Sequence, residues 1–186
     1  MKTITSSFYS GGVKNINGFF VVSVDKDFND PEPERIMKKF SLENKLKNFA
    51  GFMTAVDLER HAVFYEDQNF FVLQTLGLGH NCVPGEECKK GRTINTAVVY
   101  KKSLSMIGAM DMVQLIIGSR TYTLCREKKI AGTSTDSFLL SFIFDKNGPK
   151  YSGYATETGK NLSRIIKDVT KTRRESLAFQ SGDESP

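Results

Sequence analysis

The chain has 186 residues, enough for one domain with a full hydrophobic core but small for two. Its 39% content of hydrophobic residues lies well outside the disordered range, and no apolar run approaches the roughly 18 residues that cross a bilayer. The formal charge of +5 is modest and no apolar stretch follows Lys2 as in a secretory signal, so we expect a cytoplasmic protein that binds neither nucleic acid nor membrane.

The first half of the chain predicts mainly strands. Residues 1–14 are polar, carry a Gly-Gly pair and are expected to form a loosely held arm. Residues 18–24 (GFFVVSV) are aromatic and β-branched and predict a buried strand, whereas residues 34–47 carry the spacing of an amphipathic helix. Further apolar runs with short polar breaks predict strands at residues 50–56, 60–65, 69–76 and 93–100.

The second half predicts a helix at residues 105–128, a strand at residues 137–144 and a last helix with Thr158 as its N-cap. This order predicts one domain over residues 1–174, of the α+β or layered α/β class, with a mixed β-sheet core and flanking helices. Residues 175–186 are mostly polar and are expected to form a flexible tail.

The cysteines predict neither a disulfide framework nor a metal site. Cys82, Cys88 and Cys125 make an odd count, which argues against a framework of bridges. Cys82 and Cys88 lie near His80, but their spacing is wider than the C-x2-C of zinc sites, and a fourth ligand is lacking. We therefore predict no metal.

Three segments place small or hydroxyl residues beside the end of an apolar strand. Glycine lets the backbone approach a ligand, exposed N–H groups can bind an oxyanion, and Thr, Asn and Asp supply short hydrogen-bonding side chains. A single cluster of this kind is usually an Asx or ST turn, but three in one small domain predict a pocket. The segments are residues 75–81 (TLGLGHN), 91–95 (GRTIN) and 132–136 (GTSTD).

Familiar catalytic motifs are missing from the sequence. There is no G-x-S-x-G elbow, no H-E-x-x-H pair, no P-loop and no complete G-x-G-x-x-G. The residues by themselves predict a pocket rich in Thr, Asn and carboxylate groups, without naming a reaction.

Taken in order, these motifs resemble those of the adenosylcobinamide amidohydrolase family of corrinoid salvage. The resemblance extends from about residue 11 to residue 171. The matching segments are Met53-Thr54-Ala55; Thr75-Leu76-Gly77 with Asn81 and Pro84-Gly85-Glu86; Gly91 with Thr93-Ile94-Asn95; Gly132-Thr133-Ser134-Thr135-Asp136; and Gly153-Tyr154-Ala155-Thr156 with Gly159.

Two departures from the family pattern stand out. Arg92 is inserted within the Gly-Thr-Ile-Asn motif. The helix segment that carries Glu-Ala-Lys in the family is Gly118-Ser119-Arg120 in this chain, which keeps a positive charge and loses the acid.

The resemblance implies an enzyme that hydrolyses the amide between the corrin ring and aminopropanol in adenosylcobinamide, or its phosphate, to give adenosylcobyric acid for cobalamin biosynthesis. The partner is then a corrinoid small molecule, and cobalt enters only with this substrate, so no separate cofactor is expected. Two alternatives are a corrinoid-binding module without turnover and an amidase for a different amide. A homo-oligomer is an open possibility.

Amide hydrolysis requires stabilisation of a tetrahedral oxyanion and a proton for the departing amine. Asp136 is our first candidate for the general base and Glu86 the second. Thr133 and Thr135 are candidate hydroxyl partners, and either is a candidate nucleophile if a base lies within hydrogen-bond reach. Alternatively, Asp136 caps its own turn and Asn95 satisfies buried backbone groups. The residues expected to bind the substrate are Thr54, Thr75, His80, Asn81, Thr93 and Asn95.

Overall fold

The computed structural model describes residues 6–9, 12–14, 16–25, 28, 32–78, 82–83, 85–86, 93–128, 130–133 and 136–180. Among these residues, no helix combines the length and the apolar character needed to cross a membrane. The helices and strands in chain order are β1 (Ser6–Tyr9), β2 (Gly12–Lys14), β3 (Gly18–Ser23), α1 (Pro33–Glu43), β4 (Phe49–Thr54), α2 (Leu58–His61), β5 (Ala62–Glu66), β6 (Phe70–Leu76), β7 (Ile94–Leu104), α3 (Met106–Lys128), β8 (Ser137–Phe144) and α4 (Glu157–Gln180).

A six-stranded mixed sheet with the strand order β2-β1-β8-β7-β6-β5 forms the centre of the fold. β7 and β8 run parallel, whereas the other neighbouring strands of this sheet run antiparallel. β3 and β4 pair in parallel as a separate two-stranded sheet. The predicted class, a mixed β-sheet core with flanking helices, is confirmed.

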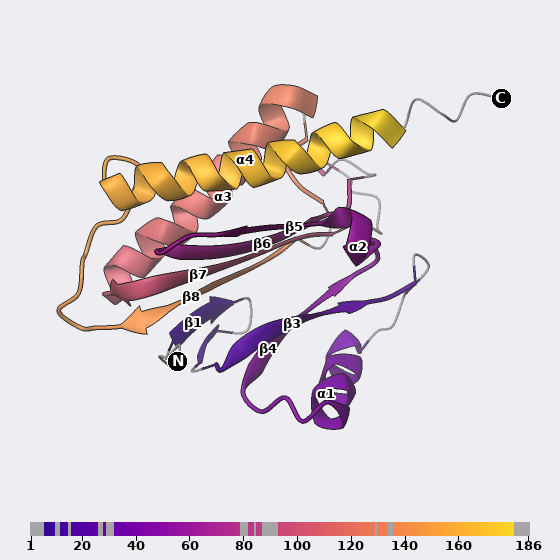
Figure 1. The fold of residues 1–186 in the computed structure, drawn as a ribbon, viewed down its shortest axis with the longest axis horizontal. Helices are drawn as coiled ribbons and strands as arrows, with labels where there is room; N and C mark the ends of the chain where they lie inside the picture. The colour runs from indigo at the N-terminus through magenta and orange to yellow at the C-terminus, as the bar shows by residue number, and fades with distance from the viewer. Residues whose placement is uncertain are drawn as a thin grey trace.

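The central sheet lies between α3 and α4 on one side and β3 and β4 on the other (Figure 1), and each face carries its own hydrophobic cluster. Alternate residues of a strand point to opposite faces, so Val72 and Val98 lie on one face while Leu73 and Ala97 lie on the other. The first face packs against α3 and α4, and the second packs against β3 and β4. The near-continuous apolar runs of β6 and β7 follow from this burial on both faces.

The ends of the chain contain more secondary structure than the sequence predicts. The expected loose arm supplies β1, which pairs with β8, and β2, which pairs with β1. These strands are short and have no strong alternation, so their pairing depends on the open edge of β8. At the other end α4 continues to Gln180, so the predicted flexible tail is helical over that part, and residues 181–186 lie outside the described residues.

Several boundaries of helices and strands differ from those predicted. Asp57 accepts hydrogen bonds from the N–H groups of Glu59 (3.0 Å) and Arg60 (3.4 Å), which starts the short helix α2 where a strand was predicted. β5 therefore begins at Ala62. β7 continues to Leu104, four residues beyond its predicted end, and α1 ends at Glu43.

The start of α4 explains the glycines and threonine of the last motif. Thr156 Oγ1 accepts a hydrogen bond from Gly159 N (2.9 Å) and donates one to the Gly153 carbonyl oxygen (2.9 Å). Thr156 is therefore the N-cap, and the prediction of Thr158 was wrong. A Cβ at Gly159 would lie 2.0 Å from the Gly153 carbonyl oxygen, so this close approach requires glycine.

We predict that Thr156→Ala lowers the free energy of unfolding by about 1 kcal/mol, the usual contribution of a Thr N-cap. Thr158→Ala is the matched control, because Thr158 lies two residues away inside the helix, and its effect should stay within about 0.5 kcal/mol. Urea unfolding of both variants measures the difference. Equal losses in the two variants would contradict the assignment of the cap.

Candidate active site

Several strand ends meet at one edge of the central sheet. β6 ends at this edge with Leu76, and β7 and β8 begin there, because β6 runs opposite to the other two. Thr75 is paired with Asn95, and Asn95 with Ser137, across the neighbouring strands. The second sheet reaches the same edge where β4 ends at Thr54, since the Asn95 side chain contacts the preceding residue of β4. Motifs far apart in the sequence therefore converge here.

Asn95 ties the two sheets together. Its Nδ2 donates to the carbonyl oxygen of Met53 (3.0 Å) and to Thr75 Oγ1 (3.1 Å), and its Oδ1 accepts from Thr93 Oγ1 (3.3 Å). Thr54, Thr75 and Asn95 are all buried. The alternative that Asn95 satisfies buried backbone holds for the Met53 carbonyl, while direct contact of these three residues with a substrate stays a prediction.

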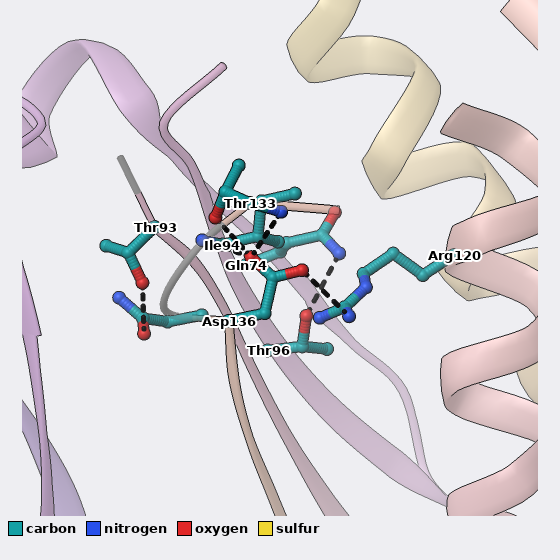
Figure 2. A network of polar contacts seen from close by, with 8 residues as sticks. Gln74, Thr93, Ile94, Thr96, Arg120, Thr133 and Asp136 are labelled. Carbon is teal, nitrogen blue, oxygen red and sulfur yellow. Dashed lines mark hydrogen bonds and ion pairs between the residues drawn. The ribbon is translucent and has the colours of Figure 1, made fainter. Parts of the chain in front are cut away.

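The carboxylate of Asp136 is the centre of a second network (Figure 2). Oδ1 accepts hydrogen bonds from Ile94 N (3.2 Å), from Thr133 N (3.2 Å) and from Thr133 Oγ1. Oδ2 accepts a charged hydrogen bond from Arg120 Nη2 (3.2 Å). One carboxylate thus joins the start of β7, the turn before β8 and helix α3, and it places the Thr133 hydroxyl within reach of a base.

Arg120 is the buried cation of this network. The side chains of Arg120 and Asp136 are only 8% and 17% exposed. Burial lowers the pKa of the Arg120 guanidinium, and the attraction of Asp136 acts in the opposite direction. Arginine nevertheless stays charged in proteins. Its Nε is buried and has no hydrogen-bond partner among the described residues. The carboxylate of Asp136 balances the charge of the guanidinium.

Sequence reasoning did not place Arg120 among the site residues. The signal was nonetheless present: over residues 106–125 of the long apolar helix, Asp111 and Arg120 are the charged side chains. A single cation on an apolar helix is expected to be paired when it is buried. Its partner lies sixteen residues further along the chain and follows only from the packing of α3 against the sheet edge.

Gly132 leaves room beside the paired carboxylate. A Cβ at this position would lie 2.7 Å from Asp136 Oδ2, closer than a real Cβ contact. The glycine therefore keeps the surroundings of Oδ2 open, while the three donors to Oδ1 fill the other oxygen of the carboxylate.

The Gly132 carbonyl also anchors a distant segment. It accepts a hydrogen bond from Cys82 N (3.1 Å) as part of an isolated β-bridge. Cys82 is disulfide-bonded, to a partner outside the described residues, and Cys125 is a free thiol. The odd count argues against a framework of several bridges, and the single disulfide at Cys82 is compatible with that prediction.

Of the other predicted site residues, the structure describes only Glu86. His80, Asn81 and Thr135 lie outside the described residues. Glu86 is exposed, and its backbone N–H donates to the Val83 carbonyl oxygen (3.0 Å). In the part of the chain that the structure describes, no group of three or more His, Cys, Asp or Glu side chains is arranged to hold a metal ion.

A further polar group, which the sequence analysis did not identify, lies on the helix-covered face of the sheet. Gln74 Nε2 donates to Thr96 Oγ1 (3.1 Å), and Thr170 Oγ1 donates to Gln74 Oε1 (3.0 Å). All three residues are buried, so these bonds fix α4 on the two strands whose ends carry Thr75 and Asn95. Gln74 and Thr96 interrupt apolar runs, which is the signal that marks them.

The family model described as adenosylcobinamide amidohydrolase matches residues 1–182. The chain belongs to this family. Membership implies an enzyme that hydrolyses an amide of a corrinoid substrate. The match covers nearly the whole chain and singles out no part of it, so the sheet edge is a candidate active site on the geometry of Asp136, Thr133 and Arg120. No curated protein matches the chain at a significant level.

We predict strong coupling between Arg120 and Asp136. Arg120→Met leaves a largely buried carboxylate without its cation and should lower the free energy of unfolding by on the order of 3 kcal/mol. In a double-mutant cycle with Asp136→Asn, the double variant should lose less stability than the sum of the two single losses, by more than about 1 kcal/mol. The losses at independent sites add within about 0.5 kcal/mol.

The control for this cycle is Asp111→Asn, which removes the other charge of this part of α3. Asp111 accepts a hydrogen bond from Ser152 N rather than from Arg120. Its effect should simply add to that of Arg120→Met in urea unfolding. Additive losses for Arg120 and Asp136 as well would show that the pair is not energetically linked.

Proposed function

We propose that the protein hydrolyses the amide that joins the corrin ring to aminopropanol in adenosylcobinamide or its phosphate. The products are aminopropanol and adenosylcobyric acid, which re-enters cobalamin biosynthesis in the cytoplasm. The observation that supports this proposal is the convergence of Thr133, Asp136 and Arg120 at the edge of the sheet, within a chain of this family.

Asp136 acts as general base through Oδ2. Three donors fill Oδ1, whereas Oδ2 receives Arg120 and has the open side beside Gly132. Oδ2 takes a proton from a water molecule as the water oxygen bonds to the amide carbon. The tetrahedral intermediate then collapses, the C–N bond breaks, and the nitrogen leaves with the proton held by Asp136. The products are one carboxylate and one amine.

Arg120 and Thr133 prepare this carboxylate for its role. Arg120 fixes the position of Oδ2 through its charged hydrogen bond. The Thr133 hydroxyl donates to Oδ1 and thereby orients the group. The same contact satisfies the geometric requirement for Thr133 as a nucleophile, with Asp136 as its base and an ester as intermediate.

The other predicted residues keep peripheral roles in this proposal. Glu86 is the alternative base, and Thr135 is a further hydroxyl partner of the reaction. Thr93 is partly buried at the start of β7 and is the described residue best placed to contact a substrate amide. His80 and Asn81 are proposed to contact the corrinoid, and Thr54, Thr75 and Asn95 to support the site from behind.

The proposed reaction is tested by incubating the protein with adenosylcobinamide and measuring free aminopropanol together with adenosylcobyric acid. We expect both products in equal amounts. Binding of the corrinoid without release would favour a binding module, which the Gly118-Ser119-Arg120 replacement makes the second candidate. Absence of both binding and release would instead indicate an amidase for another amide.

We predict that Asp136→Asn lowers kcat by about 10²–10⁴-fold, the usual contribution of a general base. The amide oxygen of Asn can still accept the backbone hydrogen bonds of Ile94 and Thr133, but Arg120 loses its counter-charge. The rate is therefore expressed per folded molecule, with the folded fraction measured by circular dichroism. Glu86→Gln is the matched variant and should retain nearly the full rate. The reverse outcome, a normal rate in Asp136→Asn and a loss in Glu86→Gln, would transfer the role to Glu86.

A second variant separates the two roles of Thr133. If water is the nucleophile, Thr133→Ala loses orientation of Asp136 but keeps measurable turnover. If Thr133 is the nucleophile, Thr133→Ala is inactive, and adding hydroxylamine to the wild-type protein diverts the ester to a hydroxamate. We expect turnover by the alanine variant and no hydroxamate, because the proposed nucleophile is a water molecule activated at Asp136 Oδ2.

A further inference from the structure

Over residues 107–121, the outer side of α3 carries no charged residue. Toward the sheet this helix buries Met112, Leu115 and Ile116. The opposite side presents residues at alternating spacings of three and four up to Thr121, and each of them is exposed or partly exposed. We call this row the outer seam; its members are Ile107, Met110, Gln114, Ile117, Thr121 and Cys125.

The outer seam is too apolar for an ordinary solvent-facing helix surface. A helix that is apolar on all sides is normally buried on all sides. Four large side chains on this part of the surface are 37–57% exposed, which amounts to roughly 370 Å² at about 200 Å² per large side chain. They are Met106, Ile107, Met110 and Ile117.

This area matches what a dimer needs. A standard interface buries about 800 Å² per partner, of which somewhat more than half is apolar. The exposed area around the outer seam supplies most of that apolar share from one helix.

We propose that the outer seam binds a second copy of this chain, with the two α3 helices antiparallel about a two-fold axis at Gln114. The seam is nearly symmetric about this residue. Ile107 and Thr121 lie seven positions to either side, and Met110 and Ile117 lie four and three positions away. An antiparallel pair therefore sets Met110 of one copy against Ile117 of the other, and Ile107 against Thr121.

Gln114 fits the position on the axis. Its amide carries both donors and acceptors, so two copies of the same side chain can bond to each other. A single polar residue within an apolar seam also fixes the register of paired helices. Self-pairing of this kind is what a two-fold, isologous interface requires.

Symmetry, and not charge, distinguishes a second copy from a lipid surface as the occupant of the seam. Arg120 points to Asp136 on the other side of the helix, and the neighbouring α4 is basic on its exposed face at Lys160, Arg164 and Lys167. An apolar strip beside basic residues also suits an anionic membrane. The symmetry of the seam about a polar centre has no role at a lipid surface, and it favours a second copy.

Light scattering coupled to size-exclusion chromatography tests the proposal. We expect the full-length protein to have twice its chain mass of 20.8 kDa. Met110→Glu and Ile117→Glu should each shift it to a monomer. In the antiparallel pair, the new carboxylate of either variant would lie against an apolar side chain of the second copy. Leu42→Glu is the matched control, since Leu42 is 70% exposed on α1, and it should remain a dimer. A wild-type monomer at every concentration would overturn the proposal.

Cross-linking tests the orientation independently of these variants. In a Cys125→Ser background, Gln114→Cys should be linked efficiently by a short bis-maleimide, with Cys125→Ser alone as the blank. The native Cys125 lies eleven residues from the axis. The two Cys125 residues of the pair are therefore roughly 33 Å apart along the helices at 1.5 Å per residue, and they should not be linked.

Linking through Cys125 but not through Gln114→Cys would contradict the antiparallel pair. A monomer that binds phosphatidylserine vesicles, and loses this binding in Met110→Glu, would replace the second copy by a membrane surface. Neither result depends on whether the protein hydrolyses adenosylcobinamide.

Discussion

The carboxylate of Asp136 accepts bonds from three segments: the start of β7, the turn before β8 and helix α3. A buried guanidinium without a counter-charge is among the most expensive groups that a fold can contain, so Arg120 on α3 requires a carboxylate at this point. The backbone N–H groups of Ile94 and Thr133 require acceptors at the starts of two neighbouring strand segments, and the same carboxylate provides them. Loss of this group would release the helix, the turn and the start of β7 together.

The same set of contacts makes the two oxygens of Asp136 unequal. Oδ1 is filled by donors that hold the side chain in place, whereas Oδ2 is balanced by Arg120 and lies beside a residue without a side chain. A group held rigidly by one atom and open at the other suits proton transfer, since its geometry needs no reorganisation during the reaction. Behind it, Asn95 and Gln74 fasten the two sheets and α4, so the edge is supported from both faces. This division supports the proposed role of Asp136 in the amide hydrolysis that family membership implies.

The sequence predicts those helices and strands that have a clear local pattern of apolar and polar residues. It does not predict structure that depends on contacts between distant elements. Residues 137–144 were predicted with the bounds that β8 has, because a run of large apolar residues lies between two turns. β1 has no such pattern, and its order comes from the edge of β8. Thr75 and Asn95 were predicted at the site and do lie at its edge, but their burial depends on the packing of β4, which no local pattern reveals. The pairing of Arg120 with Asp136 belongs to the same class of contact.

The two backbone amides that donate to Asp136 report most directly on whether a corrinoid binds at this edge. In a ¹⁵N NMR titration with adenosylcobyric acid, we expect the largest shift changes at Ile94 and Thr133, with smaller ones along the start of β7. Changes confined to the outer faces of α3 and α4, with Ile94 and Thr133 unmoved, would contradict the assignment of the active site to this edge of the sheet.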